Sequence, residues 1–196
     1  MTLIVAFSDL HCRHDFVGEI LDAARNADLV IGAGDFGHMR KRTEETLGWL
    51  APLADKAIYV PGNAESVEET RAATTARVLH GEATEMAGLK IFGLGYAVPI
   101  TPFGSWSCDL SEGEAAKLLA AMDEADILVT HSPPKGVADK TSSGASVGSE
   151  AIRAAIERVQ PRLALCGHIH DSWGVRGRIG ATEVVNLGPR PVIFEL

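Results

Sequence analysis

Several features that mark particular protein classes are scarce in this 196-residue sequence. Its three cysteines, Cys12, Cys108 and Cys166, are an odd number without Cys-x-x-Cys spacing, which argues against a disulfide framework and favours inert thiols in a reducing compartment. Long apolar runs are also missing. The first ten residues contain only a five-residue apolar run and no basic start, so they resemble neither a signal peptide nor a transmembrane span. We therefore expect a cytoplasmic protein that does not associate with membranes.

Clustered positive charge is equally scarce. The net charge of -8 and the pI near 5.3 argue against a long binding footprint on nucleic acid, because counterion release requires clustered Lys and Arg. We interpret the short basic patch at residues 40–42 as solvated surface in the first place, with substrate contact as the less favoured alternative. Bound divalent metals can reverse a local field, so an acidic chain can still hold a small phosphorylated substrate.

The composition is that of a globular α/β protein. Hydrophobic residues make up 46% and charged residues 22%, and twenty glycines provide many turns, which excludes disorder and a coiled coil. There is no internal repeat, linker or low-complexity segment. We therefore predict a single domain over residues 1–196.

Short apolar runs alternate with helical periodicities along the chain. Buried strands are predicted at residues 3–7, 29–31, 57–60, 127–129 and 163–165. Helices are predicted after a capping Asp15, at residues 43–53, after residue 65, at residues 111–122 behind a Ser111/Glu114 capping box, and at residues 152–159 before Pro161. Short strands at residues 78–80, 84–87 and 89–94 predict an antiparallel meander, and further strands are expected at residues 174–178, 183–186 and 192–196.

Two long loops interrupt this pattern. Residues 95–110 have no periodicity, and their Tyr96, Phe103 and Trp106 either stack on a flat ligand or pin the loop to the body. Residues 135–149 are rich in Gly and Ser and carry Lys135 and Lys140. We interpret these lysines and Trp106 as candidate substrate contacts, although exposed loop lysines are more often simply solvated.

Oxygen and imidazole ligands follow the main apolar runs. They are Asp9, His11, Asp35, Asn63, His131, His168 and His170. Because open α/β sheets place their ligands at the carboxyl ends of the strands, we expect these side chains to meet. Seven such ligands suffice for two divalent ions with open positions for water and substrate. The absence of cysteine among them favours a catalytic pair over a closed structural zinc site.

The order of these blocks resembles the calcineurin-like metallophosphoesterase superfamily over nearly the whole chain. The blocks are Asp9-x-His11, Gly34-Asp35, Gly62-Asn63, His131 and Gly167-His168-x-His170. The resemblance implies an α/β fold, a four-layer α/β/β/α sandwich of two mixed β-sheets, with the site on loops at one edge of the sheets.

The resemblance also implies roles for the ligands. One metal is then held by Asp9, His11 and His170, the other by Asn63, His131 and His168, and Asp35 bridges both. A metal-bridging water or hydroxide is the implied nucleophile, which attacks phosphorus in line. Mixed imidazole and carboxylate sites accept manganese, iron, cobalt, nickel or zinc, and we favour manganese.

One position departs from the family pattern. Many members have histidine after the Gly-Asn pair, where this chain has Ala64. Loss of such a proton donor costs on the order of 10² to 10⁴ in rate. Because a monoester dianion gains more from an extra cation than a diester does, the loss favours phosphodiesters. His38, His14 and Arg13 are candidates to replace the missing group.

The leading hypothesis is therefore a dinuclear metal-dependent phosphoesterase, specifically a phosphodiesterase that acts on a small or nucleotide-like substrate. One alternative is a metal-binding scaffold that kept the fold and lost catalysis. Such scaffolds usually lack several ligands, whereas all seven positions here carry side chains able to coordinate a metal. The other alternative, a phosphomonoesterase or protein phosphatase, fits the ligands but fits Ala64 less well.

Overall fold

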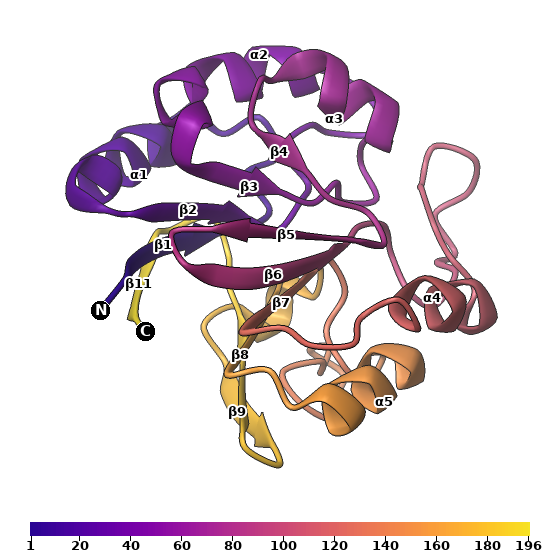
Figure 1. Cartoon of the computed structure of the whole chain (residues 1–196). Coiled ribbons are helices and arrows are strands. Elements are labelled where there is room, and N and C mark those ends of the chain that lie inside the picture. Colours follow the sequence, from indigo (N-terminus) through magenta and orange to yellow (C-terminus); the bar gives the residue numbers. More distant parts are fainter.

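The structure, a computed structural model, describes all of residues 1–196. Two mixed β-sheets pack face to face, and helices cover the outer face of each, as Figure 1 shows. The fold is therefore the four-layer α/β/β/α sandwich that the sequence predicts. No helix is both long and apolar enough to cross a bilayer.

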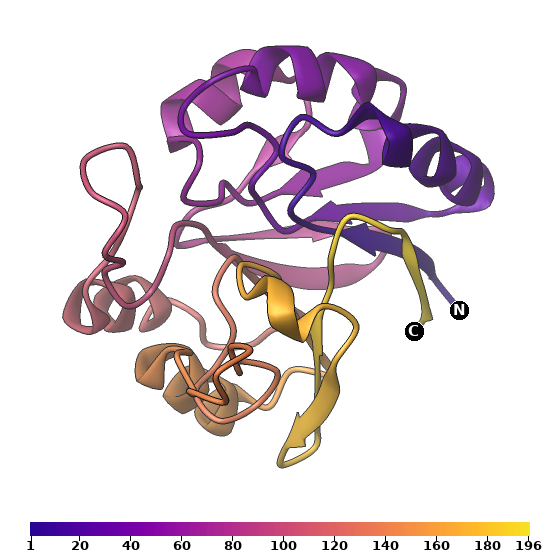
Figure 2. The ribbon, with the colours of Figure 1, turned by 180° about the vertical axis from the view of Figure 1, so that it is seen from behind.

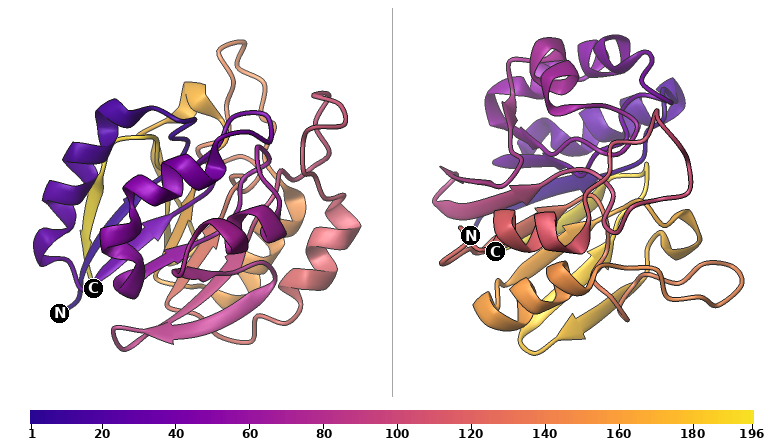
Figure 3. Two further views of the ribbon diagram at one scale, coloured as in Figure 1. Left: turned by 90° about the horizontal axis from the view of Figure 1, so that it is seen from above. Right: turned by 90° about the vertical axis from the view of Figure 1, so that its right-hand side faces the viewer.

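The first sheet has five strands. Their order is β11 (Val192–Glu195), β1 (Leu3–Phe7), β2 (Leu29–Gly32), β3 (Ala57–Tyr59) and β4 (Arg77–Val78). The four strands from β1 to β4 run parallel, whereas β11 pairs antiparallel with β1. The helices on its outer face are α1 (Val17–Ala23), α2 (Thr43–Trp49) and α3 (Val67–Ala73), seen from above in Figure 3.

The second sheet has six strands. Their order is β5 (Glu82–Met86), β6 (Leu89–Leu94), β7 (Ile127–Thr130), β8 (Leu163–Cys166), β10 (Thr182–Asn186) and β9 (Arg176–Ile179). Its central strands run parallel, and an antiparallel pair closes each edge. The outer face is covered by α4 (Glu112–Leu119) and α5 (Glu150–Val159), which Figure 2 shows from behind.

The alternation of side chains along each strand divides the core into three layers. In β1, Ile4 and Ala6 pack between the two sheets, and Val5 and Phe7 pack against the helices. A third cluster lies between the second sheet and its helices. Because the central strands are buried on both faces, they read as continuous apolar runs, and this is why the sequence reveals them.

The predicted helix ends were partly wrong. The Ser111/Glu114 capping box is confirmed, although α4 ends at Leu119. Asp15 does not cap α1, because it lies inside a 3₁₀ turn and the helix has no side-chain cap. The helix predicted at residues 43–53 ends at Trp49. The chain continues as a 3₁₀ segment, Ala51–Lys56, whose second residue, Pro52, cannot donate to an α-helical ladder.

The predicted antiparallel meander is also wrong in part. Only β5 and β6 pair antiparallel, whereas β4 pairs parallel with β3 in the other sheet. The chain crosses between the sheets just after β4, at Gly81, whose φ of 73° is in the left-handed region that glycine tolerates. Helix α4 packs against this turn through Leu118, so a side chain at position 81 would collide with it.

Candidate metal centre

All seven sequence-predicted ligands lie together where the two sheets meet. They follow the carboxyl ends of β1, β2 and β3 in the first sheet and of β7 and β8 in the second. Two groups of side chains could each hold a metal ion, with ligand atoms within 4.8 Å of one another. The first is Asp9, His11 and His170, and the second is Asp35, His131 and His168. Each group takes ligands from both sheets.

Asp35 lies between the two groups. Its Oδ2 is 3.4 Å from His11 Nε2, and its Oδ1 is 3.4 Å from His131 Nε2. The carboxylate therefore directs one oxygen toward each group, the position that a bridging ligand requires. Asn63 adds an amide oxygen to the second group, because its Oδ1 lies 3.1 Å from His131 Nε2.

The hydrogen bonds of His131 leave a place for a cation. Its Nδ1 donates to the Ala33 carbonyl at 2.8 Å, so in the neutral ring Nε2 carries only a lone pair. That lone pair faces Asn63 Oδ1, an acceptor, because Asn63 Nδ2 donates to Ser107 Oγ at 2.9 Å. Two acceptors this close need a proton or a metal ion between them.

Metal-binding atoms also converge in the first group. His11 Nδ1 donates to the Gly37 carbonyl at 3.2 Å, which leaves the lone pair on Nε2. This atom lies 3.2 Å from His170 Nε2 and close to Asp35 Oδ2. With the His170 tautomer that also places a lone pair on its Nε2, imidazole nitrogens and carboxylate oxygens converge there, so the residues present fit a divalent cation.

The local charges agree with this arrangement. Although burial alone would raise it, the pKa of Asp35 is held well below its usual range by His131 and then His11. Burial opposes a charge on His131 as well, but the Asp35 carboxylate raises the pKa of His131 to about 9. Burial and the neighbouring His131 lower the pKa of His168 to about 3. Without metals, a proton on His131 thus takes the place of a cation.

The ligand loops have unusual backbone conformations. Four ligands have a positive φ: Asp9 at 56°, His11 at 45°, Asp35 at 56° and His168 at 67°. Asn, Asp and His populate this region more readily than other residues. Gly62 allows a close approach as well, because a Cβ there would collide with the main-chain nitrogen and carboxylate of Asp35.

Glu65 supports the centre and was missed by the sequence analysis. Its carboxylate is fully buried and accepts main-chain N–H groups of Asp35 at 2.7 Å, Phe36 at 3.3 Å, Gly37 at 3.0 Å and Gly62 at 2.7 Å. It therefore ties together the loops that carry Asp35 and Asn63. Burial and the Asp35 charge raise the pKa of Glu65 to about 7. Its place directly after Gly62-Asn63-Ala64 was the only sequence signal.

Two other supports were missed as well. The Trp173 Nε1 donates to Asp9 Oδ2 at 3.0 Å, which orients the first ligand. Ser107 accepts from Asn63 and donates to Asp109 Oδ1 at 2.6 Å, so the loop at residues 95–110 is bonded to a ligand of the second group. These residues share no short motif with the ligands they hold, and no local pattern reveals them.

The ligands open onto two cavities. One, of about 320 Å³, is lined by His11, Asp35, Asn63, Phe103, Trp106, Thr141, His168, Ile169, His170 and Asp171. The other, of about 440 Å³, is lined by His11, Arg13, His38, His170 and Trp173. Because both contain His11 and His170, the two cavities flank the first ligand group.

Of the other predicted site residues, some line one of these two cavities and others line neither. Trp106 stacks on Phe103 with ring centroids 5.6 Å apart, and Phe103 also contacts the His168 ring. His38 and Arg13 lie in the second cavity, where the rings of His38 and His11 are 5.8 Å apart. His14 lines neither cavity and instead packs edge-on against Trp49.

The two loop lysines are not among the residues that line the cavities. Lys135 Nζ donates to the Ser146 carbonyl at 2.7 Å within its own loop, and Lys140 is exposed. Asp139 organises this loop by accepting the N–H groups of Gly136 and Gly148, each at 2.9 Å. Burial opposes its charge, but these bonds and one from Ser146 hold the pKa of Asp139 below its usual value.

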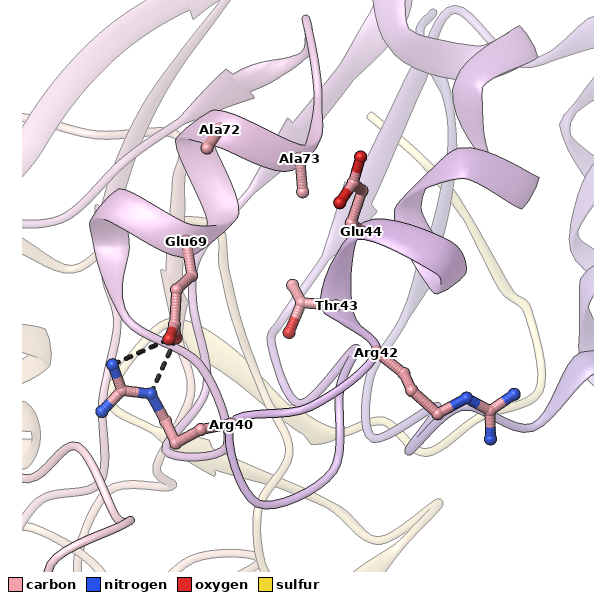
Figure 4. A pocket seen from close by; sticks show the side chains of 7 residues that line it. All are labelled: Arg40, Arg42, Thr43, Glu44, Glu69, Ala72 and Ala73. Atoms are coloured by element: carbon pink, nitrogen blue, oxygen red, sulfur yellow. Dashed lines mark hydrogen bonds and ion pairs between the residues drawn. The ribbon is translucent and has the colours of Figure 1, made fainter.

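Two residues of the basic patch at residues 40–42, Arg40 and Arg42, line a separate cavity. This cavity of about 500 Å³ lies between α2 and α3 and shares no residue with the ligand groups (Figure 4). Arg40 pairs there with Glu69, at 2.7 and 3.0 Å, and Arg42 pairs with Glu45 of its own helix. Their charges are already matched within the protein, and all three residues of the patch are exposed, as the sequence predicts.

Comparison with known proteins places the chain among phosphoesterases. A family model described as calcineurin-like phosphoesterase matches residues 2–172. The human protein named metallophosphoesterase domain-containing protein 1 is 29% identical over 233 aligned positions, which cover 99% of this chain and 68% of the human one. A UPF0046 protein of Caenorhabditis elegans is 28% identical over 137 residues, covering 63% of this chain, which spans only 33% of the nematode protein.

Solved structures share the fold at lower sequence identity. The protein TT1561 of Thermus thermophilus superposes with a TM-score of 0.76 and 20% identity, over 95% of this chain and 89% of that one. A phosphopantetheinyl hydrolase from Mycobacterium tuberculosis has a TM-score of 0.58 and 14% identity, over 96% and 95% of the two chains. At these identities the likeness concerns the fold alone.

Proposed function

The chain belongs to the calcineurin-like phosphoesterase family, and on this premise we propose that it is a dinuclear metal-dependent phosphodiesterase acting on a small or nucleotide-like substrate. The two ligand groups would each hold one divalent cation, with Asp35 between them. Bound there, the cations would supply Lewis-acid stabilisation of the phosphoryl charge and activation of water. Imidazole, carboxylate and amide oxygen together suit manganese, among other transition metals.

The protein residues have their own tasks in this proposal. Trp173 and Ser107 hold the orientations of Asp9 and Asn63, and such outer hydrogen bonds typically contribute 10- to 100-fold to metal affinity or activity. The side chain of His170 is 49% exposed, whereas that of Asp9 is fully buried. Substrate therefore reaches the centre over the first ligand group, from the side of His11 and His170.

The paired cavities are the observation that carries the assignment to diesters. A phosphodiester has two substituents on phosphorus, and a cavity lies on each side of His11 and His170. A monoester has only one substituent, so it would fill one of the two cavities and leave the other empty. The stacked Phe103 and Trp106 form an aromatic surface at the mouth of the first cavity, which suits a nucleobase or another flat group.

Ala64 supports the same assignment. Its side chain is 1% exposed and brings no proton donor, and its main-chain N–H donates to Asp35 Oδ1 at 2.8 Å. The position thus holds the Asp35 carboxylate in place and offers no group that could assist a leaving group. A small phosphorylated substrate also fits a chain of net charge -8 better than nucleic acid does. A reducing, cytoplasmic location remains our prediction from three cysteines that form no disulfide.

A substrate screen tests the proposal. The protein is loaded with Mn²⁺ and assayed on matched aryl phosphodiesters and phosphomonoesters, together with Asp35→Asn and the exposed control Asp55→Asn. We expect diester turnover to exceed monoester turnover and to fall at least about 100-fold in Asp35→Asn, with no change in the control. A large monoester preference would refute the diester assignment. Two bound cations without turnover of any ester would instead indicate a scaffold.

A further inference from the structure

Arg13 is a half-buried cation beside the metal centre that has no carboxylate partner. Its guanidinium lies 4.7 Å from the centroid of the Phe16 ring and 5.5 Å from that of Trp173. Its only hydrogen bonds are long ones, to the carbonyls of Leu10 at 3.4 Å and Asp9 at 3.5 Å. Arg190, which contacts the same Phe16 ring, is by contrast paired with Glu19. Two aromatic rings therefore hold Arg13 in place while most of its donors stay available.

The cavity next to Arg13 is unusual for so acidic a chain. None of its lining residues is a carboxylate, and His38, His11 and His170 complete it with imidazoles. The neighbouring cavity, on the other side of His11 and His170, contains Asp35 and Asp171. The cavity beside Arg13 therefore favours an anion through the protein's own side chains, although the protein as a whole has a net charge of -8.

We propose that Arg13, with His38, forms an anion-binding subsite for a carboxylate or phosphate group on one arm of the substrate. This inference rests on the proposed function, since it takes the reacting phosphorus to lie at the metal centre. The natural substrate is then an asymmetric phosphodiester, with a flat arm over Phe103 and Trp106 and an acidic arm against Arg13. A planar, stacked guanidinium suits this task, because its donors match the two oxygens of an oxyanion.

The geometry also separates this role from that of a catalytic acid. A guanidinium stays protonated at every physiological pH, so Arg13 cannot supply the proton that a histidine at position 64 would. It also lies against Phe16 and Trp173, beyond the first ligand group. We therefore assign it to binding one arm of the substrate and not to the leaving group.

Three chromogenic probes test the subsite. Each is a 4-nitrophenyl phosphodiester, and the second arm is 3-methylbutyl, 2-carboxyethyl or 2-phosphoethyl, so that the first two differ in charge at nearly constant shape. Affinity is measured by calorimetry and turnover by nitrophenol release, on the Mn²⁺-loaded protein and on Arg13→Gln, Arg13→Lys and Arg162→Gln. Arg162 is exposed and precedes β8, at the end opposite to His168, so its substitution is a charge-matched control.

The subsite predicts a charge preference that depends on Arg13. We expect the protein to bind an acidic arm roughly tenfold or more tightly than the 3-methylbutyl arm, the range of a hydrogen bond to a charged group. Arg13→Gln should bring this ratio close to one, Arg13→Lys should restore part of it, and Arg162→Gln should leave it unchanged. The carboxylate and phosphate probes show which oxyanion is preferred.

Two results would overturn the inference. One is a ratio near one in the unaltered protein, and the other is a ratio that survives in Arg13→Gln while turnover of all three probes falls equally, as a catalytic role would require. Absence of turnover with every probe would count against the proposed phosphodiesterase only, because the calorimetric ratio decides the subsite without it.

Discussion

Replacing Glu65 should loosen the metal centre without removing a ligand. Its Oε1 accepts three main-chain N–H groups, from Asp35, Phe36 and Gly62, and its Oε2 accepts the fourth, from Gly37. Glutamine can keep the three bonds to one oxygen, but its NH₂ group then faces the N–H of Gly37. Alanine leaves all four donors without a partner in a fully buried site.

The expected size of the effect follows from these contacts. Glu65→Gln should lower the free energy of unfolding by about 2 to 4 kcal/mol, because one buried donor is left unpaired and three hydrogen bonds lose a charged acceptor. Glu65→Ala should cost at least about 4 kcal/mol, because four donors lose their partner. Residues that orient metal ligands typically contribute 10- to 100-fold to metal affinity, so we expect about that loss for the glutamine variant.

Urea unfolding of the metal-free protein and Mn²⁺ titration calorimetry measure the two effects. Both are best done at pH 8, above the pKa of about 7 that burial and the Asp35 charge give Glu65. Glu45→Gln is the matched control, because Glu45 is exposed and pairs only with Arg42 on the surface. If Glu65→Gln matches the unaltered protein in both stability and Mn²⁺ affinity, Glu65 does not tie the ligand loops together.

Three further predictions concern other positions. Gly62→Ala should displace the Asp35 carboxylate and abolish tight Mn²⁺ binding in calorimetry, whereas Gly18→Ala, with no atom within 4 Å of the new Cβ, should not. Hydrogen bonds hold the pKa of Asp139 below its usual value, against the effect of burial. The Asp139 carboxylate therefore stabilises the folded protein fully above the unfolded-state pKa of about 3.9. This stabilisation is lost as the pH falls through the folded-state pKa. The difference in urea stability between the unaltered protein and Asp139→Asn should therefore shrink in acid, and a constant difference would contradict this. Ala64→His should raise monoester turnover on the order of 10²-fold or more, and an unchanged diester-to-monoester ratio would show that Ala64 does not determine the substrate preference.

The elements that the sequence predicted well are those determined by local pattern. A strand such as β1, apolar along its whole length, is recognisable because it is buried on both faces. The pairing of strands is not local. Nothing near residue 192 indicates that β11 returns to pair with β1, and the two residues of β4 carry too little pattern to choose between sheets.

In the candidate site, too, local patterns reveal some residues and not others. The seven candidate ligands could be picked out because each follows a strand whose end is visible in the sequence, and the structure brings them together. Glu65 was not predicted, because it acts through main-chain donors of Asp35 and Gly37, thirty and twenty-eight residues away, and any sequence offers such donors. Trp173 acts on Asp9 from 164 positions along the chain, a distance that no single-sequence pattern spans.

Each ligand group draws on both sheets, so cations bound there would act as staples between the two halves of the sandwich. In the first group, such a staple would join Asp9 to His170, near opposite ends of the chain. An ion that binds only the folded protein adds about 2.7 kcal/mol of stability at a concentration 100 times its Kd. The melting temperature would then report metal occupancy directly, and loss of metal in the cell would expose the protein to unfolding and degradation as well as to loss of activity.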